Sequence, residues 1–211
     1  MSKTESAAAE AHDGDALARR NALTLSVAQA LGGANPSIVV SLGGIVGYAL
    51  AVDKTLSTLP VSLMQLGLAS GVIPAAYVMR HYGRRLGYMF GGFLGVIAGA
   101  VAALGTAQSS FWLFCFGAFI AGWYAAYVQS YRFAAVDTGS EHFKPRAISW
   151  VMLGGLVAAV IGPQSVNLTR DLTPATPFAA SFLTQALLAF VAIGVVATLK
   201  PVPMPPESKG G

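Results

Sequence analysis

Polar side chains inside or at the end of long uncharged stretches are the residues of this 211-residue chain best suited to bind a small molecule. An amide or guanidinium group among apolar residues needs a hydrogen-bond partner, which the protein, water or a ligand can supply. Such groups donate and accept hydrogen bonds reversibly, so their chemistry is that of recognition. The candidates are Gln29, Asn35, Gln65, Gln129, Arg132 and Gln164.

Residues for catalysis or metal binding do not gather anywhere in the sequence. Cys115 is the single cysteine and the three histidines lie far apart, which argues against a disulfide framework and a Cys/His metal site. No nucleophile-elbow or zinc-protease motif occurs. We therefore expect no enzyme, no metal and no cofactor. The net charge of +4 is spread over short segments, so we expect no nucleic-acid partner either.

The composition predicts a protein that lies in a membrane. Hydrophobic residues make up 55% of the chain and charged residues only 10%, whereas soluble proteins carry about 25% charged residues. The mean hydropathy is +0.61. Apolar runs such as Phe111 to Phe116 are continuous and lack the alternation of β-barrel strands. We therefore predict an all-α integral membrane protein that has the lipid bilayer as its partner.

Long uncharged stretches place the predicted helices. A helix needs about 20 mostly apolar residues to cross ~30 Å of hydrocarbon. The stretch from Leu86 to Tyr131 has 46 residues, and the small polar cluster from Gly105 to Ser110 divides it, as a loop would. The sequence predicts six transmembrane helices, at about 22–52, 56–79, 86–106, 110–136, 146–166 and 177–199.

The two ends of the chain differ from the spans between them. Residues 1–20 are rich in Ala, Glu, Asp and Ser, and we expect a disordered cytoplasmic arm there. Acidic residues before the first apolar run argue against a secretory signal. Residues 200–211 are rich in proline, so we expect an extended cytoplasmic tail or linker.

Basic residues predict the orientation, because they are enriched in cytoplasmic segments close to the spans. With both termini in the cytoplasm (N-in/C-in), the outer segments contain only Lys54 and Arg170. The cytoplasmic segments then contain Lys3, Arg19, Arg20, Arg80, Arg84, Arg85, Arg132, Lys144, Arg146, Lys200 and Lys209.

Small residues at helical spacing predict close packing between the spans. Gly91, Gly95 and Gly99 form such a stripe in the third span. The fourth span carries small and polar residues on one face, which we expect to point into the bundle. These are Ala118, Gly122, Ala125, Gln129 and Arg132. For Arg132, an anchor at the membrane surface and a contact with a solute are both open.

Two further features of the spans have more than one interpretation. The segment from Gly32 to Pro36 interrupts the first span, because proline removes a backbone hydrogen bond. This break is either a structural kink or a hinge that lines a cavity. Tyr124, Tyr127 and Tyr131 form a stripe beside the small face of the fourth span, where they either pack in the core or stack on a ligand.

The loop after the second span carries a recognisable motif. The sequence M-R-H-Y-G-R-R, from Met79 to Arg85, resembles the end of the motif G-x-L-x-D-R-x-G-R-R of the major facilitator superfamily. Gly83, Arg84 and Arg85 match the end of this motif, while Arg80 stands where the family has an acidic residue. The resemblance implies that these four residues belong to a cytoplasmic gate.

Two more segments support the same resemblance. Arg132 to Asp137, followed by Arg146 to Ser149, is similar to the R-x-A-A-x-D … R-x-A-I-S pattern of bacterial members, which adds Asp137 and Arg146 to the gate. The fifth span is similar to a Gly-Pro motif associated with antiporters, although Val166 and Asn167 replace its following glycine pair. The matching residues there are Gly154, Gly155, Gly162 and Pro163.

The resemblance covers residues 22 to 199 and implies the N-terminal half of a twelve-helix transporter, with 3+3 inverted repeats. It implies a secondary active transporter of the bacterial cytoplasmic (inner) membrane that moves a small-molecule substrate by alternating access, with efflux suggested by the Gly-Pro motif. A second six-helix half would come from a longer chain, from a homodimer or from a separate subunit. The alternative is a non-transporting six-helix scaffold within a larger membrane complex.

Overall fold

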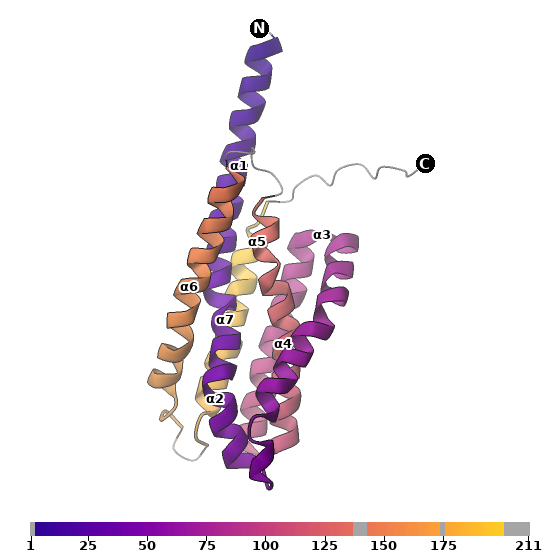
Figure 1. Cartoon of the computed structure of the whole chain (residues 1–211). Coiled ribbons are helices and arrows are strands. Elements are labelled where there is room, and N and C mark those ends of the chain that lie inside the picture. The colour runs from indigo at the N-terminus through magenta and orange to yellow at the C-terminus, as the bar shows by residue number, and fades with distance from the viewer. Residues whose placement is uncertain (1–2, 137–142, 174–175, 201–211) are drawn as a thin grey trace, which may run out of the picture.

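The computed structural model describes residues 3–136, 143–173 and 176–200, with side chains from residue 15 onward. All regular structure in these ranges is helical, without a strand, as the sequence predicts. Figure 1 shows the helices as a long bundle. They are α1 (Lys3–Gly32), α2 (Ala34–Leu50), the short 3-10 helix η1 (Lys54–Leu56), α3 (Leu59–Ala107), α4 (Phe111–Gln129), α5 (Tyr131–Ala134), α6 (Lys144–Thr169) and α7 (Ala179–Ala197).

Five helical segments in the described ranges are long and apolar enough to cross a membrane, where the sequence predicts six. Two predicted spans fall within one of these segments, because α3 passes through Gly83 without a loop. Gly83 has φ 82° and ψ 161°, and the side chain of Met79 lies against Gly87, so the chain doubles back there. Figure 1 shows the two arms of α3, residues 59–82 and 84–107. The five segments are Asp15–Leu50, Lys54–Ala107, Phe111–Ala134, Lys144–Thr169 and Ala179–Ala197.

The N-terminal segment differs from what the sequence predicts. The arm at residues 1–20 is predicted to be disordered, yet α1 begins at Lys3 and continues into the bundle. Alanine, the strongest helix former, recurs through this segment and outweighs its charged residues. The proline-rich residues 201–211 and Asp137 lie outside the described residues.

The break predicted in the first span is confirmed between α1 and α2. Gly33 separates the two helices, and its N–H group still donates to the Gln29 carbonyl at 2.8 Å. Pro36 has no N–H group to donate to the carbonyl of Gly32, so one backbone hydrogen bond is missing and the helix is kinked there. The first span is therefore kinked rather than interrupted by a loop.

Small residues bring the helices into close contact, as their spacing predicts. Cβ atoms added at Gly95 and Gly99 would meet Tyr124 of α4 and Ala186 of α7, at 2.6 and 2.6 Å. On α4, Gly122 lies directly against the backbone of α3 at Met64. These contacts leave no room for a methyl group, so each glycine is required for the observed helix separation.

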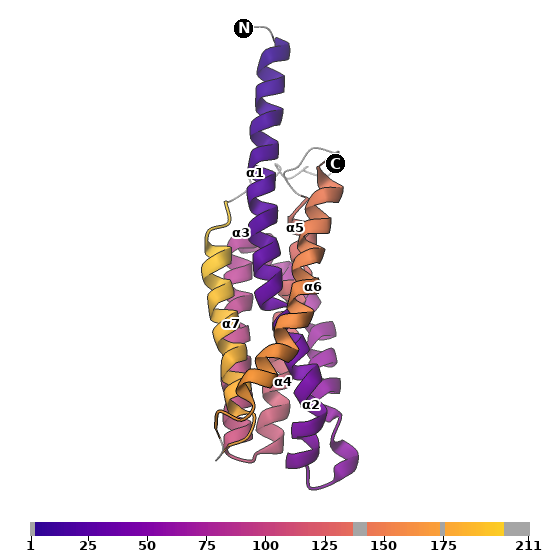
Figure 2. The ribbon, with the colours of Figure 1, turned by 90° about the vertical axis from the view of Figure 1, so that its left-hand side faces the viewer.

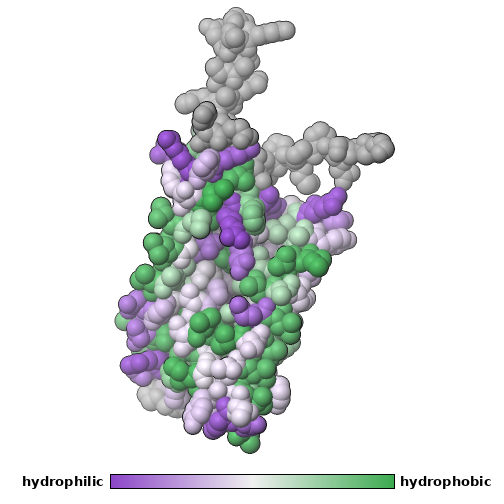
Figure 3. Space-filling model, viewed as in Figure 1, coloured by the Kyte–Doolittle hydropathy of each residue, from purple (hydrophilic) through white to green (hydrophobic). Residues whose placement is uncertain are grey.

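Both ends of the apolar bundle are polar. Figure 1 places the turn between the two arms of α3, α5 and the start of α6 at one end of the bundle, beside the N-terminal half of α1. Asn21 ties α7 to this end through reciprocal hydrogen bonds with the Lys200 carbonyl (3.3 Å) and N–H group (3.2 Å). In Figure 3, hydrophobic residues cover much of the surface between the ends. We call this the basic end, which carries Arg19, Arg20, Arg80, Arg84, Arg85, Arg132, Lys144, Arg146 and Lys200.

Replacing Gly83 with alanine is expected to lower the stability of the bundle. The φ and ψ angles of Gly83 lie in a region that is nearly exclusive to glycine, so a side chain there costs about 1–3 kcal/mol. Space is not the reason, because a Cβ atom at Gly83 would meet nothing within 4 Å. Thermal unfolding of the purified chain in detergent measures the effect.

Gly44→Ala is the matched control for this substitution. Gly44 lies inside α2 and also has free space around its Cβ position. Alanine is preferred over glycine within a helix, so this variant is expected to keep or slightly raise the unfolding temperature. Equal unfolding temperatures for the two variants would contradict the role given to Gly83.

Candidate functional site

The six polar candidates from the sequence do not converge on one site. Asn35 is buried, Gln29 is half-buried, and the other four side chains are exposed. A Cβ atom added at Gly155 would lie 3.7 Å from Gln29 Nε2, which places this amide between α1 and α6. The exposed side chains are Gln65 on α3, Gln129 on α4, Arg132 on α5 and Gln164 on α6.

Asn35 forms an interhelical hydrogen bond with a residue that the sequence analysis does not select. Gln185 Nε2 on α7 donates to Asn35 Oδ1 at 2.9 Å, and both side chains are at most 1% exposed. Gln185 meets the criterion used for the other candidates, since it is an amide in an uncharged stretch.

The interior around this pair contains further polar atoms. Asn35 Nδ2, Gln185 Oε1 and Tyr124 Oη are buried without a hydrogen-bond partner among the described residues. Tyr124 Oη lies at the kink, because a Cβ atom added at Gly32 would be 2.7 Å from it. Two of the interior side chains with an unpartnered polar atom, Asn35 and Tyr124, therefore lie close to the break at Gly33.

The predicted inward face of α4 is confirmed for its small residues and wrong for its polar ones. Ala118, Gly122 and Ala125 are buried in the bundle, whereas Gln129 and Arg132 are exposed. Helix α4 ends at Gln129, with Ser130 as its C-cap, and α5 begins at Tyr131, so the two polar residues stand at the end of α4 and beyond it. The guanidinium of Arg132 lies over the ring of Phe133, 5.0 Å from its centroid.

The tyrosine stripe packs in the core. Tyr124, Tyr127 and Tyr131 are at most 2% exposed. Tyr131 meets Tyr88 edge to face, with ring centroids 4.7 Å apart. These contacts favour the packing interpretation over stacking on a ligand.

The gate residues suggested by the resemblance surround the Gly83 turn and the start of α6. Arg80 and Arg85 are exposed, Arg84 is half-buried and has an interaction of its own, and Arg146 is exposed. Glycine at position 83 is explained by its backbone angles. The structure thus accounts for the turn, while Asp137 lies outside the described residues.

The Gly-Pro segment packs α6 against the kinked first span. Gly154 lies directly against the Ser26 carbonyl, and the Ser26 hydroxyl donates to the Trp150 carbonyl at 2.7 Å. A Cβ atom at Gly162 would lie 3.1 Å from the Ala34 carbonyl oxygen. Pro163 is half-buried within α6. The motif therefore contacts α1 and α2 on both sides of the break at Gly33.

The end opposite the basic end has a compact loop. Lys54 Nζ donates to the carbonyls of Tyr48 and Ala51, at 2.7 and 2.9 Å, where its charge complements the C-terminus of α2. Hydrogen bonds from the N–H and hydroxyl groups of Thr55 lower the pKa of Asp53. Within the described residues, no group of three or more His, Cys, Asp or Glu side chains could hold a metal ion.

Comparisons with known proteins find relatives among membrane transporters. The family model described as Major Facilitator Superfamily matches residues 22–211. The riboflavin transporter RfnT of Brucella anthropi is 56% identical over 183 residues, which cover 87% of this chain and 46% of the relative. The uncharacterized MFS-type transporter YdeG of Bacillus subtilis is 29% identical over 196 residues, 89% of this chain and 45% of the relative.

The matched relatives are longer than this chain. A second MFS-type transporter of Bacillus subtilis, the uncharacterized YddS, is 26% identical over 188 residues, 85% of this chain and 42% of the relative. The chain thus spans about half the length of the curated relatives it matches. No solved structure matches it significantly.

Removing either partner of the Asn35–Gln185 pair is expected to destabilise the bundle. Asn35→Leu or Gln185→Leu leaves the other amide buried without its partner, at a cost of about 1–3 kcal/mol. The double variant is expected to lose less than the sum of the two, by the ~0.6–1.7 kcal/mol typical of a strong interhelical hydrogen bond in a membrane. Unfolding in detergent measures all three variants.

Gln164→Leu is the matched control, since Gln164 is an exposed glutamine on α6 without an interhelical hydrogen bond among the described residues. We expect its stability to stay within about 0.5 kcal/mol of the unaltered chain. Additive losses in the Asn35/Gln185 double variant would argue that the two amides do not interact.

Proposed function

This chain belongs to the major facilitator superfamily, and from that premise we propose that it is the N-terminal six-helix half of a secondary active transporter. The family match over residues 22–211 and the coverage of about half of each relative support this proposal. The six spans are the five apolar segments, with the two arms of α3 counted separately. The half moves a small molecule by alternating access, together with a second half.

The orientation we propose is N-in/C-in, in the inner membrane of a bacterium. The grouping of the basic residues at one end supports it, because such residues favour the cytoplasmic side. Asn21 of α1 and Lys200, which follows α7, both lie at that end, because two hydrogen bonds join them. The curated relatives come from bacteria, which supports the choice of membrane.

Riboflavin is the substrate that we propose. The observation that carries this choice is the 56% identity to a riboflavin transporter over 87% of this chain. The chemistry of the half is compatible with it, since riboflavin is uncharged and offers ring imide groups and hydroxyls to amide side chains. Gln29, half-buried between α1 and α6, is the candidate that we place in the path, with Gln65, Gln129 and Gln164 on exposed faces. The Gly-Pro motif is the ground for proposing efflux.

Binding of riboflavin tests the substrate. Purified chain is expected to quench riboflavin fluorescence, and Gln29→Leu is expected to weaken binding about 2- to 10-fold through the loss of one hydrogen bond. Gln108→Leu, an exposed glutamine at the opposite end of the bundle, is the control and is expected to bind normally. Equal weakening by both variants would contradict the placement of Gln29, and no quenching by the unaltered chain would contradict riboflavin as the ligand.

A test of transport first has to establish what supplies the second half. The protein mass of the detergent-solubilised particle, measured by light scattering, distinguishes a homodimer near twice 21.7 kDa from a single half. Uptake of labelled riboflavin into vesicles, in both orientations, then tests transport and its direction. Stable co-purification with a different membrane protein, without riboflavin transport, would favour the scaffold alternative.

Arg84→Ala is expected to lower transport more than it lowers the yield of folded protein. Arg84 follows the turn at Gly83 and is only half exposed, so its charge can hold neighbouring carbonyl or acidic groups at the gate. Arg170→Ala, at the opposite end, is the control and is expected to change neither. Parallel loss of transport and folded yield in Arg84→Ala would assign this arginine a structural role instead.

A further inference from the structure

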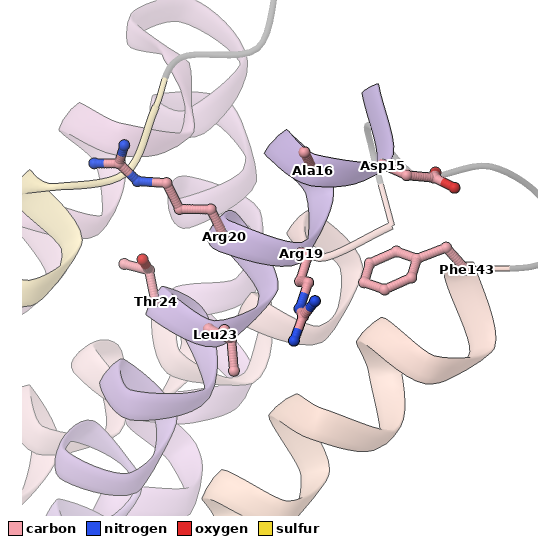
Figure 4. Close-up of a pocket in the computed structure, with 7 residues that line it drawn as sticks. All are labelled: Asp15, Ala16, Arg19, Arg20, Leu23, Thr24 and Phe143. Atoms are coloured by element: carbon pink, nitrogen blue, oxygen red, sulfur yellow. The ribbon is translucent and has the colours of Figure 1, made fainter. Parts of the chain in front are cut away.

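An open hollow of about 720 Å³ lies at the basic end of the bundle, between α1 and the first turn of α6. Figure 4 shows side chains around it: Arg19 points toward the start of α6, where Phe143 lies, and Arg20 extends to the other side of α1. Leu23 and Thr24 line its deeper part, toward the apolar bundle. No role proposed above for this chain involves these residues.

The packing of α1 against α6 creates this hollow. The helices touch at Gly154, which lies directly against the Ser26 carbonyl, and the Ser26–Trp150 hydrogen bond fixes this contact. Figure 2 shows α6 diverging from α1 toward the basic end. Phe143 lines the hollow on the α6 side, and Trp150 packs against its ring edge to face, with centroids 5.6 Å apart. The hollow is therefore a wedge that opens toward the basic end and closes among apolar residues.

The charges at the mouth of this wedge favour an anion. Within the described part of the chain, Arg19 and Arg20 have neither a hydrogen bond nor an ion pair. Guanidinium groups bind phosphate oxygens through paired hydrogen bonds. Asp15, the acidic residue of the lining, stands one helical turn, about 6 Å, farther out along α1. An anion at the level of the arginines therefore avoids direct contact with this carboxylate.

An apolar track continues below the arginines. Leu23 and Val27 follow Arg19 at intervals of four residues on α1, and their side chains are 48% and 51% exposed. The uncharged stretch of the first span begins immediately after Arg20, so the arginines stand where the hydrocarbon gives way to head groups. A ligand with an anionic head and an apolar chain matches both parts of this surface.

We propose that the hollow binds an anionic phospholipid of the surrounding membrane, with its phosphodiester at Arg19 and an acyl chain along Leu23 and Val27. Basic pockets between helices at the cytoplasmic surface suit such head groups. The lipid fills the wedge between α1 and α6 above the Gly154 contact, and so links the N-terminal part of the first span to the fifth. This site is separate from the proposed path and does not depend on riboflavin transport.

Native mass spectrometry of the full chain in detergent tests the site, with phosphatidylglycerol and phosphatidylcholine as the probes. Phosphatidylglycerol is expected to remain bound at lower concentration than phosphatidylcholine. The double variant Arg19→Gln/Arg20→Gln is expected to weaken phosphatidylglycerol binding by about ten-fold or more, because it removes the phosphate contact of Arg19 and the additional positive charge of Arg20. Leu23→Asn keeps both charges and is expected to weaken the same binding through the acyl chain.

Arg80→Gln/Arg85→Gln is the matched control, since it removes the same charge from an exposed pair at the same end. Its phosphatidylglycerol binding is expected to change by less than about two-fold, because general attraction falls off with exposure and salt. Equal losses in the two double variants, or equal retention of the two lipids by the unaltered chain, would overturn the proposal. Unfolding temperatures without added lipid verify that each variant is folded.

Glycerol phosphate and inorganic phosphate, added as competitors, identify the source of the phosphate group. Neither is expected to displace phosphatidylglycerol, because neither has an acyl chain to occupy the track at Leu23 and Val27. Displacement by millimolar free phosphate would overturn the lipid assignment and indicate a site for a soluble anion.

Discussion

Direct contact between helix backbones is the constraint on which this bundle depends. In lipid, apolar side chains gain little by leaving the hydrocarbon, so helices associate through close packing and hydrogen bonds between them. Gly122 provides such a contact with α3, Gly154 provides one with α1, and Gly99 provides one with α7. Because each contact fixes two helices at short distance, it also fixes the side chains that the helices present elsewhere.

The kink in the first span shows how these contacts control polar groups. Gly33 and Pro36 bend the span, and Gly154 and Gly162 of α6 pack on either side of the bend. Asn35, two residues beyond Gly33, meets Gln185 of α7, and the two amides share a hydrogen bond in an interior made mostly of apolar residues. The polar interior is thus a consequence of the kink and of the small residues that cover it.

Much of the fold could be predicted because the sequence carries local signals for it. The fifth span, predicted at 146–166, is α6 at Lys144–Thr169, and the sixth, predicted at 177–199, is α7 at Ala179–Ala197. The Gly83 turn follows from its place in a motif and from a backbone conformation that only glycine adopts easily. The helical start of α1 differs from the disorder that its charge and polarity predict, because the helix preference of alanine outweighs them.

By itself the sequence determined which segments are helical and apolar, because bilayer thickness and the need to satisfy backbone hydrogen bonds act on each segment separately. Only the tertiary structure decided what each polar side chain meets. Gln129 shares a helical face with buried Ala125 yet is exposed at the end of α4, whereas Gln185 is buried against Asn35 of α2. The direction of a side chain follows from its own helix, but its environment depends on helices far away in the chain.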